Sequence, residues 1–285
     1  PAADLPRHAV LLRSGQFLLM PSEGARGGAH VGIKVATVAP NNPARGLPRI
    51  QASYLLFDAE SLGLIAMLDG TALTTLRTPA VSVAAVASRL KARTGSVALA
   101  VLGAGPQAHG HIATLAAVLA PHRLLGPVSH LVREPARVTP ADGAEIVALG
   151  SPQARDVLRA ADVVVCATSA RSPLFDAELI ADTAVVIAVG SHEPDARELP
   201  GVLCARATVV VEDIATALRA AGDVRLALDE GALQAAELVP MRDLVTGRAQ
   251  PDPARPLVFK SVGMSWEDLI VAEAVLRGRS TTTAR

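Results

Sequence analysis

The stretch AVLGAGPQAHGH, residues 100–111, combines an apolar run with a glycine turn that could bind a phosphate group. Gly103 and Gly105 follow residues typical of a strand and precede residues typical of a helix, and Ala108 stands where a third glycine is common. Such a turn directs backbone N–H groups and the positive end of a helix at an anion. Glycines also simply end strands, so it is the strand, turn and helix together that predict a dinucleotide-binding site.

The next apolar run, VSHLVRE at residues 128–134, bears on the choice of cofactor. Val132 ends the run and Arg133 follows it, an order that suits the 2′-phosphate of NADP. Glu134 leaves a conventional contact with the ribose of NAD open, and Arg133 could also be an ordinary exposed arginine. The sequence therefore favours NADP and leaves NAD as the alternative.

Two cationic residues stand in places where a charge calls for an explanation. Lys34 lies inside the apolar segment VGIKVATV, where a charge is costly unless it is paired or lines a cavity. It could instead protect the edge of a sheet from aggregation. Arg77 comes just before the expected start of a helix, where it would add a planar set of donors to an anion site, or it could be a surface residue.

His192 is a candidate for proton transfer. It follows the apolar run AVVIAVGS, and loops at the carboxyl ends of parallel strands are where ligands bind in such sheets. A histidine there can donate or accept a proton near neutral pH, although a surface histidine fits the sequence equally well. Asp195 and Glu198 in the same turn are interpreted as residues that begin a helix.

The first part of the chain is predicted to form an antiparallel sheet. Residues 31–38 are typical of a strand, and residues 51–70 contain two apolar runs around a polar turn, as in a hairpin. A helix is expected to begin just beyond Arg77, with Thr78 as its N-cap and Pro79 in its first turn.

The elements that follow indicate a parallel sheet. From residue 96, short β-branched runs alternate with helical segments, as in strands joined by crossover helices. The segment PLVFKSVGM predicts one more strand, and a last helix is expected from Ser265. Glu267 and Asp268 fall in the first turn of that helix, where acids favour the helix dipole.

Composition narrows the classes of partner. The 285 residues include 27 basic and 27 acidic side chains and 2% aromatic residues, so neither a general positive field nor stacking surfaces favour nucleic acid. The longest apolar run is too short to span a membrane. Cys166 and Cys204 lie far apart in apolar segments, which argues against a disulfide framework or a metal site. We expect a soluble, cytoplasmic protein without a metal.

Taken together, these segments resemble the ornithine cyclodeaminase and mu-crystallin family over nearly the whole chain. The matching pieces, in order, are LPRHAV, LLMPS, GIKVATVAPNN, LLFDAESLGLIAMLDG, LTTLRTPAVSVAA, VLGAGPQA, AVGSHEPDARELP, AGDV and FKSVGMSWEDL. Members usually have a further helix before the LPR segment, so we expect this chain to begin late in the family pattern.

The resemblance implies an α/β fold in which a Rossmann-type NAD(P)-binding domain, residues 96–258, is inserted into a discontinuous α+β domain. That second domain, residues 1–95 with 259–285, would bind the substrate and form a homodimer. In the family a basic trio holds the substrate carboxylate, and the substrate-binding positions implied here are Arg7, Lys34, Arg77 and Val262. The implied cofactor-binding positions are Arg77, Gly103, Gly105, Pro106, Gln107, Arg133, Thr168, Val189, Gly190, Ser191 and Ser261. Ser261 and Val262 are expected on a strand that the second domain contributes.

One position departs from the best-known members. Ornithine cyclodeaminases and the family's alanine dehydrogenases have an aspartate where this chain has His192, and the mu-crystallin branch, which resembles ketimine reductases, also lacks it. We therefore expect a reductase of small cyclic imino acids that forms proline or pipecolate, with Lys34 and His192 as the catalytic candidates. The alternatives are an ornithine cyclodeaminase, and a protein that binds NADP and a small acidic ligand without turnover.

Overall fold

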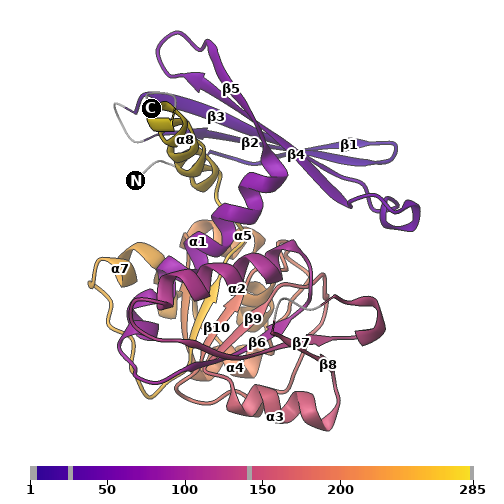
Figure 1. Ribbon diagram of the computed structural model, residues 1–285, viewed down its shortest axis with the longest axis vertical. Helices are drawn as coiled ribbons and strands as arrows, with labels where there is room; N and C mark the ends of the chain where they lie inside the picture. The colour runs from indigo at the N-terminus through magenta and orange to yellow at the C-terminus, as the bar shows by residue number, and fades with distance from the viewer. Residues whose placement is uncertain (1–4, 25–27, 140–142, 283–285) are drawn as a thin grey trace. The chain divides into compact units, whose positions relative to one another are not determined.

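The computed structural model describes residues 5–24, 28–139 and 143–282. The chain divides into two compact units, which are described separately (Figure 1). Unit 1 combines residues 1–77 with residues 263–285, and unit 2 comprises residues 78–262. Both ends of the chain thus contribute to unit 1, whereas unit 2 is continuous in sequence.

Unit 1 contains an antiparallel sheet whose five strands lie in chain order. The strands are β1 (His8–Leu12), β2 (Gly15–Glu23), β3 (His30–Val38), β4 (Ile50–Asp58) and β5 (Leu64–Asp69), and a short 3-10 helix, Pro43–Arg45, lies between β3 and β4. The predicted strand and hairpin are confirmed: β3 pairs with β4, and β4 pairs with β5, both antiparallel.

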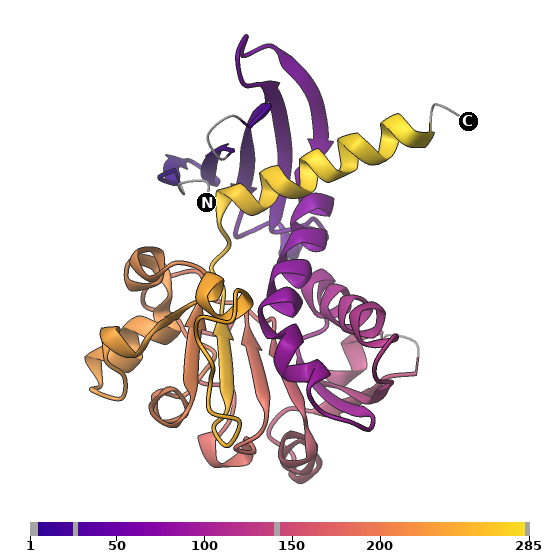
Figure 2. The same ribbon diagram turned by 90° about the vertical axis from the view of Figure 1, so that its left-hand side faces the viewer.

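One face of this sheet packs against α8 (Ser265–Thr282), which Figure 2 shows as the long yellow helix. Alternate residues of a strand point to opposite faces, so Tyr54 and Leu56 of β4 share this face. Both are fully buried, and they form a core with Leu269 and Ala272 of α8 and with Leu73. The helix that the sequence left without a partner therefore completes the core of unit 1.

Helix α1 spans Gly70–Lys91, so the prediction that it begins beyond Arg77 was wrong. The Asp69 carboxylate accepts hydrogen bonds from the backbone N–H groups of Thr71 (2.8 Å) and Ala72 (3.0 Å), which caps the helix about two turns before the expected start. Pro79 lies inside the helix, where it has no N–H to donate to the carbonyl of Thr75. Arg77 is consequently an interior helical residue.

Unit 2 contains a parallel sheet of eight strands in the order β12-β11-β13-β10-β9-β6-β7-β8. The strands are β6 (Val97–Leu102), β7 (Leu125–Val132), β8 (Glu145–Ala148), β9 (Val163–Cys166), β10 (Val185–Ala188), β11 (Thr208–Val211), β12 (Val239–Pro240) and β13 (Leu257–Lys260). The chain runs outward from β6 through β7 to β8 and then returns to place β9 on the other side of β6. The Rossmann-type α/β fold is therefore confirmed.

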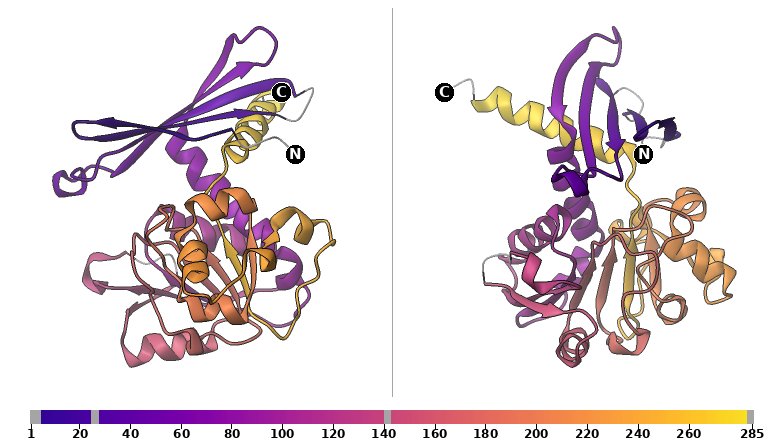
Figure 3. Two further views of the ribbon diagram at one scale, coloured as in Figure 1. Left: turned by 180° about the vertical axis from the view of Figure 1, so that it is seen from behind. Right: turned by 90° about the vertical axis from the view of Figure 1, so that its right-hand side faces the viewer.

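Helices cover both faces of the parallel sheet, and each face has its own apolar core (Figure 3). The helices are α2 (Pro106–Leu119), α3 (Pro152–Ala160), α4 (Gly201–Arg206), α5 (Ile214–Ala220), α6 (Gly222–Asp229) and α7 (Met241–Val245), with 3-10 helices at Pro135–Arg137, Ala177–Leu179 and Ala235–Glu237. Strand residues alternate between the cores: Leu99 and Val101 face α1 and α2, whereas Ala100 and Leu102 face α3. None of the helices in the described ranges has the length and apolar character needed to cross a bilayer.

Strand β13 differs from its expected place. It pairs in parallel with β10 and with β11, so it belongs to the sheet of unit 2 and not to the domain built from the chain ends. All four of its residues, Leu257–Lys260, are buried, as a strand covered by helices on both faces requires. The expected domain boundaries, 95/96 and 258/259, accordingly differ from the observed divisions at 77/78 and 262/263.

Candidate active site

The glycine turn of unit 2 lies where the strand order reverses. Gly103 directly follows β6, which pairs with β7 on one side and with β9 on the other, and ligands bind at such switch points in open parallel sheets. Gly103 has φ +106°, and a Cβ there would lie 2.6 Å from the carbonyl oxygen of Ala167. The turn therefore requires glycine both for its backbone conformation and for its close approach to the end of β9.

The start of α2 leaves room for an anion. Gly105 is its N-cap and Pro106 its first residue, so the end is not covered by a capping side chain. A Cβ on Gly105 would meet no atom within 4 Å, whereas Ala108, one turn inside the helix, is fully buried. Gln107 is half-buried beside this turn. The arrangement fits a pyrophosphate held by the N–H groups of the first helical turn.

A buried histidine supports this turn, and the sequence analysis missed it. Nδ1 of His130 lies 2.9 Å from the carbonyl oxygen of Gly103. A carbonyl can only accept, so Nδ1 carries a proton and donates it to Gly103. His109 packs edge-on against His130, with the ring centres 5.4 Å apart. In the sequence His130 appeared only as a polar residue inside an apolar strand.

The end of β7 presents the two residues that bear on cofactor choice. Arg133 and Glu134 follow Val132 and are both exposed. Glu134 forms an ion pair with Arg137 across 2.9 Å. The carboxylate thus has a cationic neighbour of its own, and the Arg133 side chain extends from the strand end into solvent.

Glu198 joins two strand ends and does not begin a helix, so the interpretation of this residue was wrong. Its side chain is fully buried: one oxygen accepts from the N–H and hydroxyl of Thr168, both at 2.8 Å, and the other from the N–H of Gly190 at 2.7 Å. Burial raises the pKa of Glu198, while the Lys260 charge and the Thr168 hydrogen bonds oppose that change. Asp195, by contrast, is exposed and pairs with Arg171 at 2.5 Å.

His192 lies on the loop after β10, directly beyond Val189, Gly190 and Ser191, and its side chain is half-exposed. The Ser191 hydroxyl donates to the Ala196 carbonyl, which closes the loop on itself. The predicted cofactor residues Thr168 and Gly190 are joined through Glu198, as described above. The proposed roles of these residues stay predictions.

Ser261 and Val262 follow the carboxyl end of β13 in unit 2, which corrects the expectation that the other domain contributes them. The Glu212 carboxylate accepts from the Ser261 hydroxyl at 2.6 Å and from the Val262 N–H at 3.0 Å. Glu212 follows the neighbouring strand β11, so it fixes the exit of β13 to the next strand of the same sheet.

In unit 1 the three basic residues come together. Lys34 is 3% exposed and Arg77 6% exposed. Arg7 donates from Nη2 to the carbonyl oxygen of Gly263 at 2.9 Å. Gly263 itself lies against Arg77, because a Cβ at that position would be 2.6 Å from Nη2 of Arg77. Residues far apart in sequence thus form one cationic cluster, comprising Arg7, Lys34 and Arg77.

Two buried carboxylates of α8 hold this cationic cluster. Nζ of Lys34 lies 2.7 Å from an oxygen of Asp268, and Arg77 contacts Glu267 at 2.7 Å and Asp268 at 3.3 Å. Both carboxylates are 1% exposed or less. Their interpretation as helix-dipole residues missed this role. A formal count of three cations and two anions leaves one positive charge, which suits a ligand with one carboxylate.

The Lys34 ammonium is less basic than an ordinary lysine. Burial and the nearby charge of Arg77 lower its pKa from 10.5 to about 8, against the opposing effect of Asp268. Near neutral pH the group is charged, yet it can release its proton at a modest cost. Lys34 can therefore both attract a carboxylate and donate a proton.

Comparison with known proteins shows the family. The model of the ornithine cyclodeaminase/mu-crystallin family matches residues 2–281. The chain belongs to this family. It is 33% identical over 268 residues to the mouse ketimine reductase mu-crystallin, covering 93% of this chain and 81% of that protein.

Two Δ1-pyrroline-2-carboxylate reductases are also similar to this chain. The chain is 31% identical over 265 residues to a Δ1-pyrroline-2-carboxylate reductase of Bacillus cereus, covering 90% of this chain and 79% of that protein. The solved structure of the Thermococcus litoralis Δ1-pyrroline-2-carboxylate reductase with NADH and L-proline has a TM-score of 0.82 and 27% identity, covering 95% of this chain and 85% of that one.

The buried ion pairs of unit 1 make a prediction about stability. Asp268→Asn should lower the free energy of unfolding by about 3–5 kcal/mol, because Lys34 and Arg77 would lose a buried counter-charge. Urea denaturation measures the change. Asp156→Asn, which affects an exposed pair with Arg159, is the control and should cost less than about 1 kcal/mol.

A double-mutant cycle with Lys34→Met tests the cause. Lys34→Met/Asp268→Asn should cost less than the sum of the two single changes, since the second change removes a charge that the first has left unpaired. Additive costs would contradict the assignment of the pair as a coupled unit.

Proposed function

We propose that this protein is an NAD(P)H-dependent reductase of small cyclic imino acids, converting 1-pyrroline-2-carboxylate or 1-piperideine-2-carboxylate to proline or pipecolate. The observation that carries the proposal is the buried cationic cluster, in which Lys34 has a pKa of about 8 beside two arginines. Further support comes from the ketimine reductase and pyrroline-2-carboxylate reductase relatives.

Each residue of the cationic cluster has a task in this proposal. Arg7 and Arg77 bind the substrate carboxylate, and the planar guanidinium groups fix its orientation. Lys34 adds charge to the same site and keeps the imine nitrogen protonated, which makes C2 more electrophilic. The C=N π electrons move to nitrogen as C2 is reduced, and the product is a secondary amine.

The turn after β6 would hold the cofactor. The α2 N-terminus and the close approach at Gly103 fit a pyrophosphate, and Thr168, Val189, Gly190, Ser191 and Ser261 are the positions proposed for the remaining contacts. When bound, the nicotinamide supplies the hydride that reduces C2. Arg133, exposed at the end of β7, supports NADP over NAD, since its guanidinium can neutralise a 2′-phosphate.

Two residues of unit 2, His192 and Val262, have further proposed roles. His192 takes the place of the aspartate of the cyclodeaminase branch, and its imidazole can donate a proton or limit the substrates that fit. The absence of a carboxylate at this position favours reduction over cyclodeamination, because cyclodeamination needs a group that handles the free substrate amine. Val262 offers an apolar contact for the ring of the substrate.

An assay panel tests the function. The panel contains both cyclic imino acids, their linear counterparts, ornithine and alanine, each with NADPH and with NADH. We expect sustained oxidation of NADPH with a cyclic imino acid and a slower rate with NADH. Release of ammonia from ornithine without net cofactor turnover would instead identify a cyclodeaminase, and no turnover of any substrate would favour the binding protein.

In the same assay Lys34→Ala should lower kcat/KM by about a hundredfold or more, because it removes both a charge and a proton donor. Its affinity for NADPH should not change, since the proposed cofactor contacts of the glycine turn lie in unit 2. Lys91→Ala, which alters an exposed lysine at the end of α1, is the matched control. Full activity of Lys34→Ala would contradict the proposed role.

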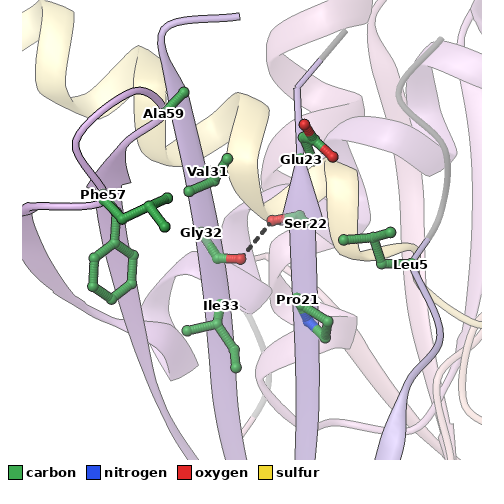
Figure 4. A pocket seen from close by; sticks show the side chains of 10 residues that line it. Leu5, Pro21, Ser22, Glu23, Val31, Gly32, Ile33, Phe57 and Ala59 are labelled. Carbon is green, nitrogen blue, oxygen red and sulfur yellow. Dashed lines mark hydrogen bonds between the residues drawn. The ribbon is translucent and has the colours of Figure 1, made fainter. Parts of the chain in front are cut away.

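We also infer a homodimer through the face of the unit 1 sheet that α8 does not cover. Across the strands this face carries the row Pro21, Ile33, Leu55 and Met67, which the register places opposite one another. Met67 is 73% exposed, and a pocket on the same sheet is lined by Pro21, Ile33 and Phe57 (Figure 4). Pro21, Ile33 and Leu55 are half-buried, and an apolar row of this kind on the sheet face that α8 does not cover supports an interface.

Sedimentation analysis tests this interface. The protein should sediment as a dimer, and Leu55→Glu/Met67→Glu should sediment as a monomer because two charges would be buried in the interface. Leu124→Glu, at an exposed leucine of unit 2, should remain dimeric. A double variant that stays dimeric would place the interface elsewhere.

Two buried free thiols, Cys166 and Cys204, support the further inference of a reducing, cytoplasmic location.

A further inference from the structure

Unit 2 contains a buried group of charges that the proposed reaction does not use directly. Its members are Glu198, Asp223 and Lys260, each at most 1% exposed. They come from three separate places in the chain: the loop after β10, helix α6 and the last residue of β13. Charged side chains are almost never so completely buried unless each is paired, and a cost of this size requires a reason.

The contacts of this group lead to two strand ends that carry Thr168 and Gly190, which are among the positions proposed for cofactor contacts beyond the pyrophosphate. Glu198 binds the N–H of Thr168 after β9 and the N–H of Gly190 after β10, at 2.8 and 2.7 Å. Parallel strands leave such N–H groups without partners where the sheet ends, so a single carboxylate here fixes the separation of two adjacent exits.

Asp223 and Lys260 in turn hold Glu198 and the loop that follows β10. Asp223 accepts from the backbone N–H groups of Glu198 (2.7 Å) and Leu199 (2.8 Å), and its other oxygen lies 3.0 Å from Nζ of Lys260. Nζ of Lys260 also donates to the carbonyl oxygen of Ser191 at 2.6 Å. The residue directly before His192 is thus held by a buried ammonium group.

Two glycines allow close packing around this group. A Cβ on Gly190 would lie 2.1 Å from the carbonyl oxygen of Thr168 and 2.5 Å from Glu198. A Cβ on Gly222, which precedes Asp223, would lie 2.0 Å from the carbonyl oxygen of Ala196. Both glycines allow backbone segments to approach more closely than a residue with a side chain permits, so this packing requires glycine at both positions.

We propose that Glu198, held by the Asp223–Lys260 pair, is the positioning residue that fixes the nicotinamide end of the cofactor site and the loop that carries His192. This inference rests on the proposed function for the identity of the cofactor. It assigns no contact with substrate to Glu198. Its action is on the backbone of Thr168 and Gly190.

The test compares the affinity for a cofactor that contains the nicotinamide with the affinity for a fragment that lacks it. NADPH contains the nicotinamide, whereas 2′-phospho-ADP-ribose has the same phosphates without it. In Glu198→Gln one carboxylate oxygen becomes an amide NH₂, which cannot accept from an N–H group. We expect this variant to bind NADPH about tenfold or more weakly, and 2′-phospho-ADP-ribose within about twofold of the wild type. Asp195→Asn, in the same loop but exposed, is the matched control and should change neither affinity.

Equal weakening for both ligands, or no weakening, would overturn the proposal. If Glu198→Gln does not fold, amide hydrogen exchange of the wild-type protein decides instead. The N–H groups of Thr168 and Gly190, although outside the strands, should exchange at least about a hundredfold more slowly than those of exposed loop residues. Fast exchange of these two N–H groups would refute the proposal that Glu198 holds them. A wild-type protein that binds neither NADPH nor NADH would refute the proposed function. The exchange result would still show whether Glu198 holds the N–H groups of Thr168 and Gly190.

Discussion

The buried pairing of Lys34 and Arg77 with Asp268 and Glu267 is the interaction on which unit 1 depends. It joins the central strand of the sheet, the first helix and the last helix, so residues from both ends of the chain share one polar core. Two buried cations without these carboxylates would be too costly to keep charged. The same pairing leaves a formal surplus of one positive charge and a lysine whose pKa is about 8. The ion pairs that stabilise unit 1 therefore also create the charge that we propose binds a carboxylate.

In unit 2, buried polar side chains fix the loops at the carboxyl edge of the parallel sheet. A parallel sheet ends in unpaired backbone groups, and loops at its carboxyl edge must hold one shape if they are to bind a cofactor. Gly103 and His130 fix the turn after β6, and Glu198 fixes the exits of β9 and β10. Glu212 does the same between β11 and β13. Buried acceptors, each directed at backbone or hydroxyl donors, thus define the edge of the sheet where ligands bind.

Much of this organisation could be predicted from the sequence. Periodicity identified the antiparallel strands and the alternating parallel elements, and the glycine turn was recognised from its strand and helix. The roles of Glu267, Asp268 and Glu198 could not be predicted from the sequence. An acidic residue can either favour a helix dipole or neutralise a buried cation, and the residue type alone does not distinguish the two. Only tertiary packing decides between these. The early start of α1 was missed for a related reason: the cap at Asp69 outweighs the local Thr-Pro signal. The position of β13 in the sheet depends on its pairing with strands that are distant in sequence, and a local sequence pattern does not indicate such pairing.

Lys34 is a buried ammonium group whose pKa is lowered to about 8 by burial, and we propose that it binds the substrate carboxylate. The most direct measurement is the affinity of pyrrole-2-carboxylate, a flat analogue that cannot be reduced in this way, determined by calorimetry from pH 7 to 9.5 with saturating NADP⁺. Lys34 loses its charge as the pH rises through its pKa, so the affinity should fall at least about fivefold over this range in the wild type and remain flat in Lys34→Met. An affinity that does not change with pH in the wild type, or that falls equally in Lys34→Met, would contradict this role of Lys34.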